Sequence, residues 1–301
     1  MSNTIRGLGQ FISIERGFML YMISVAATFL IQGKLAWREA IYIGVMVFCG
    51  WSAVDAINNI CDVNLDTISD PFRARFTKNL GRFGLVITLL LCALTFSLAV
   101  VTRNFLVIVF IFLAFSAGVL YSVHPFRLRQ TIYKPAVNFC VGALPILIAA
   151  AFASRFSENV WALVFLFGLA TAVYSLWGDL ADYGSDLDAG GRTLPIVLGL
   201  KRGFCATIAS GFSLFPLMAL VGVMFQLNIP YYLVLFSLAI YLSIRVIPKR
   251  SLLLPGSTYD DALEGLGQTL VKDFVFIAIV QTTNLMLSAF LKFQGFSFSV
   301  V

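Results

Sequence analysis

The chain has 301 residues, of which 59% are hydrophobic and 12% are charged, whereas an average soluble domain has about 25% charged residues. This composition excludes a soluble globular protein, because the apolar residues fall in segments of about 18 to 22, enough to cross a hydrocarbon layer of about 30 Å. The net charge of +6 does not indicate nucleic-acid binding, because most of the basic residues fall on one side of the predicted topology.

Breaks between the apolar segments predict an all-α, polytopic membrane protein with about nine transmembrane helices. Very short connections alternate with long polar loops at 60–83, 123–134, 179–202 and 248–271. An odd number of spans places the two termini on opposite sides of the membrane. The predicted spans are 17–33, 39–59, 84–101, 104–122, 135–153, 159–178, 203–225, 230–247 and 272–291.

Most of the basic residues lie on one side of the predicted membrane topology. Of the 21 Lys and Arg residues, all except five fall in the N-terminal arm, the long loops or their flanks. The positive-inside rule therefore predicts that the N-terminus and the long loops are cytoplasmic. The five exceptions are Lys34, Arg38, Arg103, Arg155 and Lys292.

A first acidic motif, "NNICDVNLD", ends the second predicted span. Asn58, Asp62 and Asp66 are spaced four residues apart, so on a helix they would stack on one face over two turns. Carboxylates at membrane depth are costly and indicate a functional site by default.

A second acidic motif, "GDLADYGSDLDAGGRTLP", follows the sixth predicted span. Asp179, Asp182 and Asp186 are spaced i, i+3, i+7 and would again share a helical face, whereas Asp188 would lie roughly 200° around the helix from Asp186. Three residues that terminate helices come directly afterwards: Gly190, Gly191 and Pro195.

Oxygen ligands without histidine suit a hard cation such as Mg²⁺, which usually bridges to substrate phosphates. We therefore predict a diphosphate held by Mg²⁺ between the two motifs, under an apolar cavity in which some of the 29 Phe residues line a long isoprenoid tail. The alternative is that the acids cap solvated helix ends and pair with loop arginines. The basic residues expected to balance the phosphate charge are Arg73, Lys78, Arg127, Arg129 and Arg192.

Taken together, these motifs resemble the UbiA superfamily of intramembrane prenyltransferases. The first family motif, N-x-x-x-D-x-x-x-D, is met by Asn58, Asp62 and Asp66. The second, D-x-x-D-x-x-x-D followed by G-x-x-T-L-P, is met by Asp179, Asp182, Asp186, Gly190, Thr193, Leu194 and Pro195. The segment "YSVHPFRLR" at 121–129 is similar to the family's Y-S-x-x-P-x-R-L-K, and the next span carries Asn138 and Gly142 at the expected places.

The resemblance implies nine helices around a central cavity. An apolar span that ends in an Asp cluster occurs twice, near 62 and near 182, so we predict a single domain whose two halves (about 1–130 and 131–301) are related. The resemblance implies an enzyme of the bilayer that removes diphosphate from an allylic prenyl diphosphate with Mg²⁺ and joins the prenyl group to a lipophilic acceptor. By position, Asn58, Asp62, Asp182 and Asp186 would hold the metal, and Asp66 and Asp179 would support them. The resemblance also implies that Arg73, Arg127 and Arg129 bind the diphosphate. We predict Asp62, Asp66, Asp182 and Asp186 as catalytic residues, and the full predicted diphosphate-binding set is Arg73, Lys78, Tyr121, Arg127, Arg129, Asn138 and Arg192.

The sequence departs from the family pattern at several positions. Asn59 replaces the family's Asp after the first Asn, "RARFTK" replaces a proline-containing segment after the first motif, and Glu15-Arg16 replaces an Arg-Pro in the first span. These changes leave the acceptor open among lipid, quinone and tetrapyrrole classes. Two other functions also stay open, namely a membrane terpene cyclase with the same metal motifs and a cation-coupled transporter.

Overall fold

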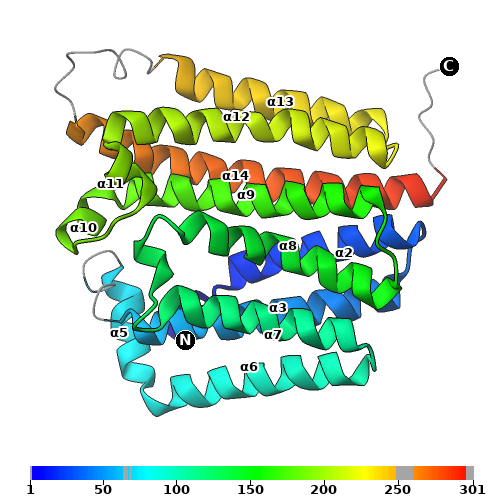
Figure 1. Ribbon diagram of the computed structural model, residues 1–301, viewed down its shortest axis with the longest axis horizontal. Helices are drawn as coiled ribbons and strands as arrows, with labels where there is room; N and C mark the ends of the chain where they lie inside the picture. The colour runs from blue at the N-terminus through cyan, green and yellow to red at the C-terminus, as the bar shows by residue number, and fades with distance from the viewer. Residues whose placement is uncertain (1, 64–66, 68–69, 249–259, 296–301) are drawn as a thin grey trace. The chain divides into compact units, whose positions relative to one another are not determined.

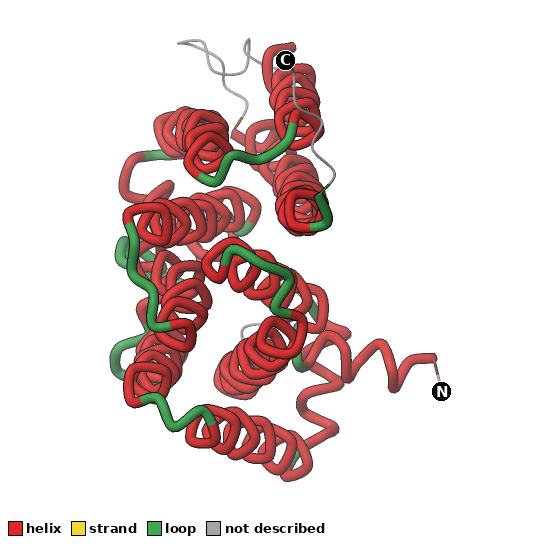
Figure 2. Tube along the Cα trace, turned by 90° about the vertical axis from the view of Figure 1, so that its right-hand side faces the viewer, coloured by secondary structure: helices red, strands yellow, loops and turns green. Residues whose placement is uncertain are grey.

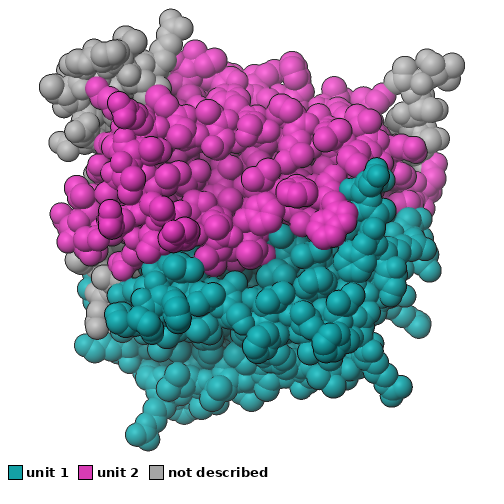
Figure 3. All heavy atoms as spheres, in the orientation of Figure 1, with its two compact units in different colours: residues 1–129, 143–160 teal, residues 130–142, 161–301 magenta. Residues whose placement is uncertain are grey.

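The structure is a computed structural model that describes residues 2–63, 67, 70–248 and 260–295. Within these residues the chain is helical and contains no strand (Figure 1). The chain divides into two compact units, residues 1–129 with 143–160 and residues 130–142 with 161–301, which Figure 3 distinguishes by colour.

Nine helices of the described residues are long and apolar enough to cross a membrane, which confirms the predicted all-α, polytopic fold. Eight of the nine predicted spans agree with the observed helices to within three residues at each end. The arrangement around a central cavity and the relationship between the chain halves stay predictions. The nine are α2 (Ile14–Gln32), α3 (Trp37–Cys61), α6 (Arg82–Val101), α7 (Phe105–Ser122), α8 (Lys134–Ala153), α9 (Glu158–Ala181), α12 (Leu200–Met224), α13 (Ile229–Val246) and α14 (Asp260–Phe293).

Unit 1 is organised around α3, which packs against α2, α6 and α7. Close approach of these helices depends on residues without side chains. A Cβ on Gly44 would lie 2.7 Å from the ring of Tyr21 on α2. Small residues at such crossings are typical of helices that associate within a bilayer, because van der Waals packing replaces the hydrophobic effect there. Two further helices belong to this unit: α1 (Ser2–Phe11) and α5 (Pro71–Leu80).

Unit 2 contains α9 from residue 161 onward and the α12–α13–α14 group, in which α13 packs against both α12 and α14. The seam between α13 and α14 is polar. Tyr241 and Arg245 bind the two carboxylate oxygens of Asp273, each at 2.7 Å. Interhelical hydrogen bonds of this kind hold helices together in apolar surroundings. The unit also contains two short helices, α10 (Tyr183–Asp188) and α11 (Leu194–Leu198).

The largest differences from the sequence-based prediction lie in the polar loops. The loop predicted at 60–83 contains α5, which begins with Asp70 as N-cap and Pro71 in the first turn, a recognised start signal in a segment too polar to count as a span. The loop predicted at 179–202 contains α10 and α11. The last helix begins at Asp260 rather than at 272, because its first turns are polar and hydropathy detects only the membrane-spanning part.

Candidate active site

The first acidic motif lies where α3 ends. Asp62 is the C-cap of α3, and its backbone N–H donates to the carbonyl of Asn58 at 2.9 Å. The helical relationship predicted for this motif therefore holds between these two residues, whereas Asp66 lies outside the described residues. The Asn58 side-chain oxygen accepts a hydrogen bond of 2.9 Å from Ser122 at the end of α7, which fixes the amide.

Two arginines enclose the carboxylate of Asp62. Arg127 binds Oδ1 at 2.8 Å, and Arg129 is paired with Oδ2. The Asp62 side chain is 0% exposed, so its charge is removed from water and needs these partners. The sequence predicted that Asp62 binds the metal and that the two arginines bind the diphosphate. The structure brings them into direct contact.

The remaining candidates of unit 1 lie on α5 and α7. Arg73 is in the first turn of α5, where its backbone N–H donates to the N-cap Asp70 at 3.1 Å and its side chain lies 3.9 Å from the same carboxylate. Lys78 is exposed in the last turn of α5, and Tyr121 is half-buried one residue before the end of α7. Each side chain thus sits close to the end of a helix of unit 1.

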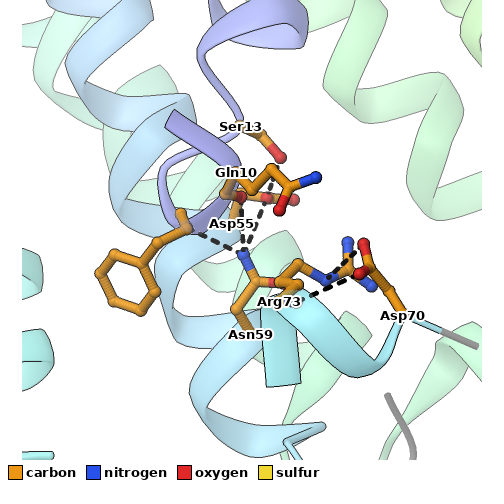
Figure 4. A network of polar contacts seen from close by, with 7 residues as sticks. Gln10, Ser13, Asp55, Asn59, Asp70 and Arg73 are labelled. Carbon is orange, nitrogen blue, oxygen red and sulfur yellow. Dashed lines mark hydrogen bonds and ion pairs between the residues drawn. The ribbon is translucent and has the colours of Figure 1, made fainter. Parts of the chain in front are cut away.

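A buried polar network lies beside the first motif, and sequence reasoning missed it (Figure 4). Asn59 donates its amide to the backbone oxygen of Phe11 at 2.8 Å and to the carboxylate of Asp55 at 3.3 Å. Asp55 also accepts a hydrogen bond from the Ser13 hydroxyl. In the sequence Asn59 stands out only as a departure from the family pattern. Ser13 and Asp55 belong to no recognised motif, so the sequence does not indicate their contacts with Asn59.

The second acidic motif is not one uninterrupted helix, and that expectation is wrong. α9 ends at Ala181, and Asp182, with φ −100° and ψ 12°, precedes the first residue of α10. Backbone N–H groups donate across the break with the four-residue spacing of an α-helix, from Asp182 to the Gly178 carbonyl and from Asp186 to the Asp182 carbonyl. The side chains nevertheless differ in environment, because Asp179 is buried, Asp182 is exposed and Asp186 is intermediate.

Asp179 is paired with Lys134 at the start of α8. The Asp179 side chain is 0% exposed, and its second oxygen, Oδ2, is buried without a hydrogen-bond partner among the described residues. Sequence reasoning missed Lys134 as a site residue, because 45 positions separate it from Asp179 and no spacing rule connects them. An unpartnered, buried carboxylate oxygen is a ready acceptor for a cation or a hydrogen-bond donor.

The segment after α10 is held by backbone contacts. Gly190 has a φ of 71°, and a Cβ on Gly191 would lie 2.8 Å from the Asp186 carbonyl, so both positions favour glycine. The Arg192 backbone N–H donates to Gln130 at 2.8 Å, while its side chain is exposed. Asn138 donates to the Lys134 carbonyl at 3.0 Å, so two of the predicted residues contact the segment around Lys134.

The donor set of these motifs fits a hard divalent cation. The candidate ligands are carboxylate and amide oxygens, and the buried Oδ2 of Asp179 still has capacity for one. Within the described residues, which omit Asp66, no group of three or more His, Cys, Asp or Glu side chains is positioned to hold a metal ion. The fit therefore rests on the chemistry of the donors.

These features define a class of protein: an all-helical, multi-pass membrane protein with two aspartate motifs at the ends of its spans. The sequence pattern of the UbiA prenyltransferase family matches residues 19–259. The chain belongs to this family and is an enzyme of the prenyltransferase class.

Several known proteins are similar to this chain. Digeranylgeranylglyceryl phosphate synthase of Haloquadratum walsbyi (strain DSM 16790 / HBSQ001) is 27% identical over 230 residues, which are 75% of each chain. The apo structure of a UbiA homologue from Aeropyrum pernix K1 has a TM-score of 0.69 at 17% identity, covering 91% of this chain and 98% of that one. A UbiA homologue from Archaeoglobus fulgidus, bound to GPP and Mg²⁺, has a TM-score of 0.64 at 15% identity, covering 92% and 99%. At these identities the two structures are evidence of a shared fold.

Proposed function

We propose that this enzyme transfers a prenyl group from an allylic prenyl diphosphate to a lipophilic acceptor and releases diphosphate in a Mg²⁺-dependent reaction. The observation that carries the proposal is the pairing of buried motif carboxylates with cations, Asp62 with Arg127 and Arg129 and Asp179 with Lys134. Such a set supplies oxygen ligands for a metal and positive charge for a phosphate ester.

In unit 1, Asn58, Asp62 and Asp66 are proposed to supply metal ligands. Arg127 and Arg129 are proposed to bind the diphosphate, since a planar guanidinium matches phosphate oxygens in bidentate geometry. Their contact with Asp62 holds both side chains in place at the end of α3. Arg73, Lys78 and Tyr121 complete the proposed substrate-binding set of this unit.

In unit 2, Asp179, Asp182 and Asp186 are proposed to supply the second group of metal ligands. The exposed Asp182 and the half-buried Asp186 are accessible, and Asp179 offers one oxygen beyond its pair with Lys134. Asn138 and Arg192 belong to the proposed diphosphate-binding set. We add Lys134, because its ammonium group is paired with Asp179 of this motif.

In the proposed reaction the allylic C–O bond breaks, and its electron pair leaves with the diphosphate. A nucleophilic atom of the acceptor then forms a bond to the same allylic carbon and loses its proton. Bound Mg²⁺ would supply electrostatic stabilisation of the departing diphosphate. The name of the Haloquadratum relative favours a glyceryl phosphate lipid as the first acceptor to test, ahead of quinones and tetrapyrroles.

The test uses purified protein, a panel of prenyl diphosphates and the three acceptor classes, with diphosphate release and product masses as readouts. We expect a prenylated acceptor, with release abolished by EDTA and restored by Mg²⁺. Diphosphate release that yields a cyclic hydrocarbon or alcohol without acceptor would instead establish a cyclase. Absence of diphosphate release with every donor would contradict the proposal and favour the transporter alternative.

A further inference from the structure

The N-terminal helix does not continue the first span. Ser13, with φ 46° and ψ 56°, separates α1 from α2 in a left-handed conformation that non-glycine residues adopt rarely. In Figure 2, α1 runs across the view towards the marked N-terminus, whereas the spans of unit 1 are seen nearly end-on. α1 therefore runs across the direction of these spans.

The buried network of Figure 4 holds this bend. Asn59 binds the backbone oxygens of Phe11 and Gln10 at the end of α1, and Asp55 accepts from Ser13 in the bend itself. Asp55 is 7% and Asn59 is 1% exposed, so the cost of burying these groups is offset by the hydrogen bonds that fix α1. The same contacts place α1 at the end of α3 that carries Asp62.

The faces of α1 differ in polarity. Gly7 faces the ring of Phe76 on α5, and Phe11 is buried. Ile5 and Leu8, one turn apart, are 67% and 39% exposed. Asn3 lies about 200° around the helix from Ile5 and is also exposed. An apolar face, a packed face and a polar face on one helix are typical of a segment that lies in the membrane interface.

Exposed cations lie on α1, on α5, which packs against α1, and at the start of α6, which packs against α5. Arg6 lies 4.9 Å above the ring of Phe72 on α5, so this cation of α1 contacts the helix that carries Arg75. Arg75 and Arg82 are exposed like Arg6. No Asp or Glu occurs within α1, α5 or the first turn of α6. The adjoining acids are Glu15, in the first turn of α2, and Asp70, the N-cap of α5, whose carboxylate lies 3.9 Å from Arg73.

We propose that α1 and the adjoining cations Arg6, Arg75 and Arg82 form a binding surface for anionic lipid head groups. Ile5 and Leu8 insert at the boundary between head groups and acyl chains, and the three guanidinium groups contact lipid phosphates. None of these residues belongs to the proposed catalytic or diphosphate-binding set, so the proposal does not depend on the proposed function.

The first test measures retention of phosphatidylglycerol by native mass spectrometry, using full-length protein from phosphatidylcholine discs with and without phosphatidylglycerol. The triple variant Arg6→Gln, Arg75→Gln, Arg82→Gln should weaken retention by about tenfold or more, since one Lys or Arg near an anionic surface contributes on the order of fivefold. The matched control is Lys34→Gln, Arg38→Gln, Arg103→Gln, which removes three exposed cations from connections predicted on the opposite side. Equal losses in both triple variants, or no loss in the first, would overturn the proposal.

The second test reports the depth of α1 without removing a charge. A Trp at position 5 (Ile5→Trp) should be quenched by lipids brominated in the upper acyl chain, over the background of the four native Trp residues. A Trp at position 3 (Asn3→Trp), on the polar face, should add almost no quenching. Equal quenching of the two, or none at either position, would show that α1 does not lie in the interface.

Discussion

The buried carboxylates of this protein are each bound by a cation or a hydrogen-bond donor. Asp62 has two arginines and Asp179 has Lys134, while Asp55 has a hydroxyl and an amide. The sequence predicted Asp62 and Asp179 as site residues from motif spacing. The pairing of acids with loop arginines was the alternative interpretation, and Arg127 and Arg129 were predicted to bind diphosphate. Lys134 was missed, because it reaches Asp179 only through packing of segments 45 positions apart in the chain.

The first prediction separates motif carboxylates from a neighbouring one. Asp62→Asn, Asp182→Asn or Asp186→Asn removes the proposed metal-binding charge at constant size, so each should lower turnover by on the order of 10² or more, equivalent to about 2.7 kcal/mol. Asp188→Asn, at the exposed last residue of α10, removes the same charge nearby and should change turnover by no more than about threefold. Diphosphate release at saturating Mg²⁺ is the measurement. Equal damage from Asp188→Asn and Asp186→Asn would refute the proposed ligand set.

A second prediction concerns the departure from the family pattern at Asn59. Asn59→Asp replaces the amide donor to Phe11 and Asp55 with a second buried carboxylate, so we expect a loss of about 3 kcal/mol of stability. An apparent melting temperature in detergent measures the effect. Asn79→Asp, on the exposed end of α5, is the control. If the two variants melted at the same temperature, the network would not hold the bend at Ser13.

The helices differ in how well sequence predicts them. A membrane span is a local property of about 20 apolar residues, so the predicted bounds were close for most spans. α5, α10 and α11 were missed because they are short and polar and depend on caps and backbone contacts. The break at Asp182 was missed for a related reason, since residue spacing alone cannot distinguish a continuous helix from two helices that share hydrogen bonds across an interruption.

At the level of helices, the contact between α8 and α9 should depend on the Lys134–Asp179 pair. Lys134→Met leaves a fully buried carboxylate without its cation, which should cost about 3 kcal/mol or more and lower the apparent melting temperature. Adding Asp179→Asn removes the unpaired charge and should recover most of that loss. No recovery in the double variant would mean that Lys134 acts through packing of its aliphatic stem.

For the whole molecule, the sequence predicted a multi-pass membrane protein and its family, and both are confirmed. These properties follow from composition and from short motifs, which need no knowledge of packing. Sidedness rests on the distribution of the 21 basic residues and stays a prediction. Acceptor identity is a property of the side chains around the substrate, and no short motif in the chain encodes it.

The topology prediction can be tested in a variant whose five native cysteines are replaced by alanine. Cysteines introduced at Asn79 and Asp188, both exposed, should react with an impermeant maleimide from the cytoplasmic face only. A cysteine at the exposed Lys34 should react from the other face only. Labelling of Asn79→Cys and Asp188→Cys from opposite faces would contradict the assignment of both aspartate motifs to the cytoplasmic side.

The contact of Asp62 with Arg127 and Arg129 has a thermodynamic consequence. In the proposed function the carboxylate binds Mg²⁺ and the guanidinium groups bind diphosphate. Binding of either ligand breaks the ion pair and so frees the protein group that binds the other ligand. Their affinities should then be reciprocally linked. Calorimetry with a non-hydrolysable diphosphate analogue should give tighter binding with Mg²⁺ than without it, and Asp62→Asn should reduce that difference several-fold. An undiminished difference in the variant would place the cooperativity in the Mg²⁺–diphosphate complex itself rather than in the protein, whose ion pair would then be a passive support.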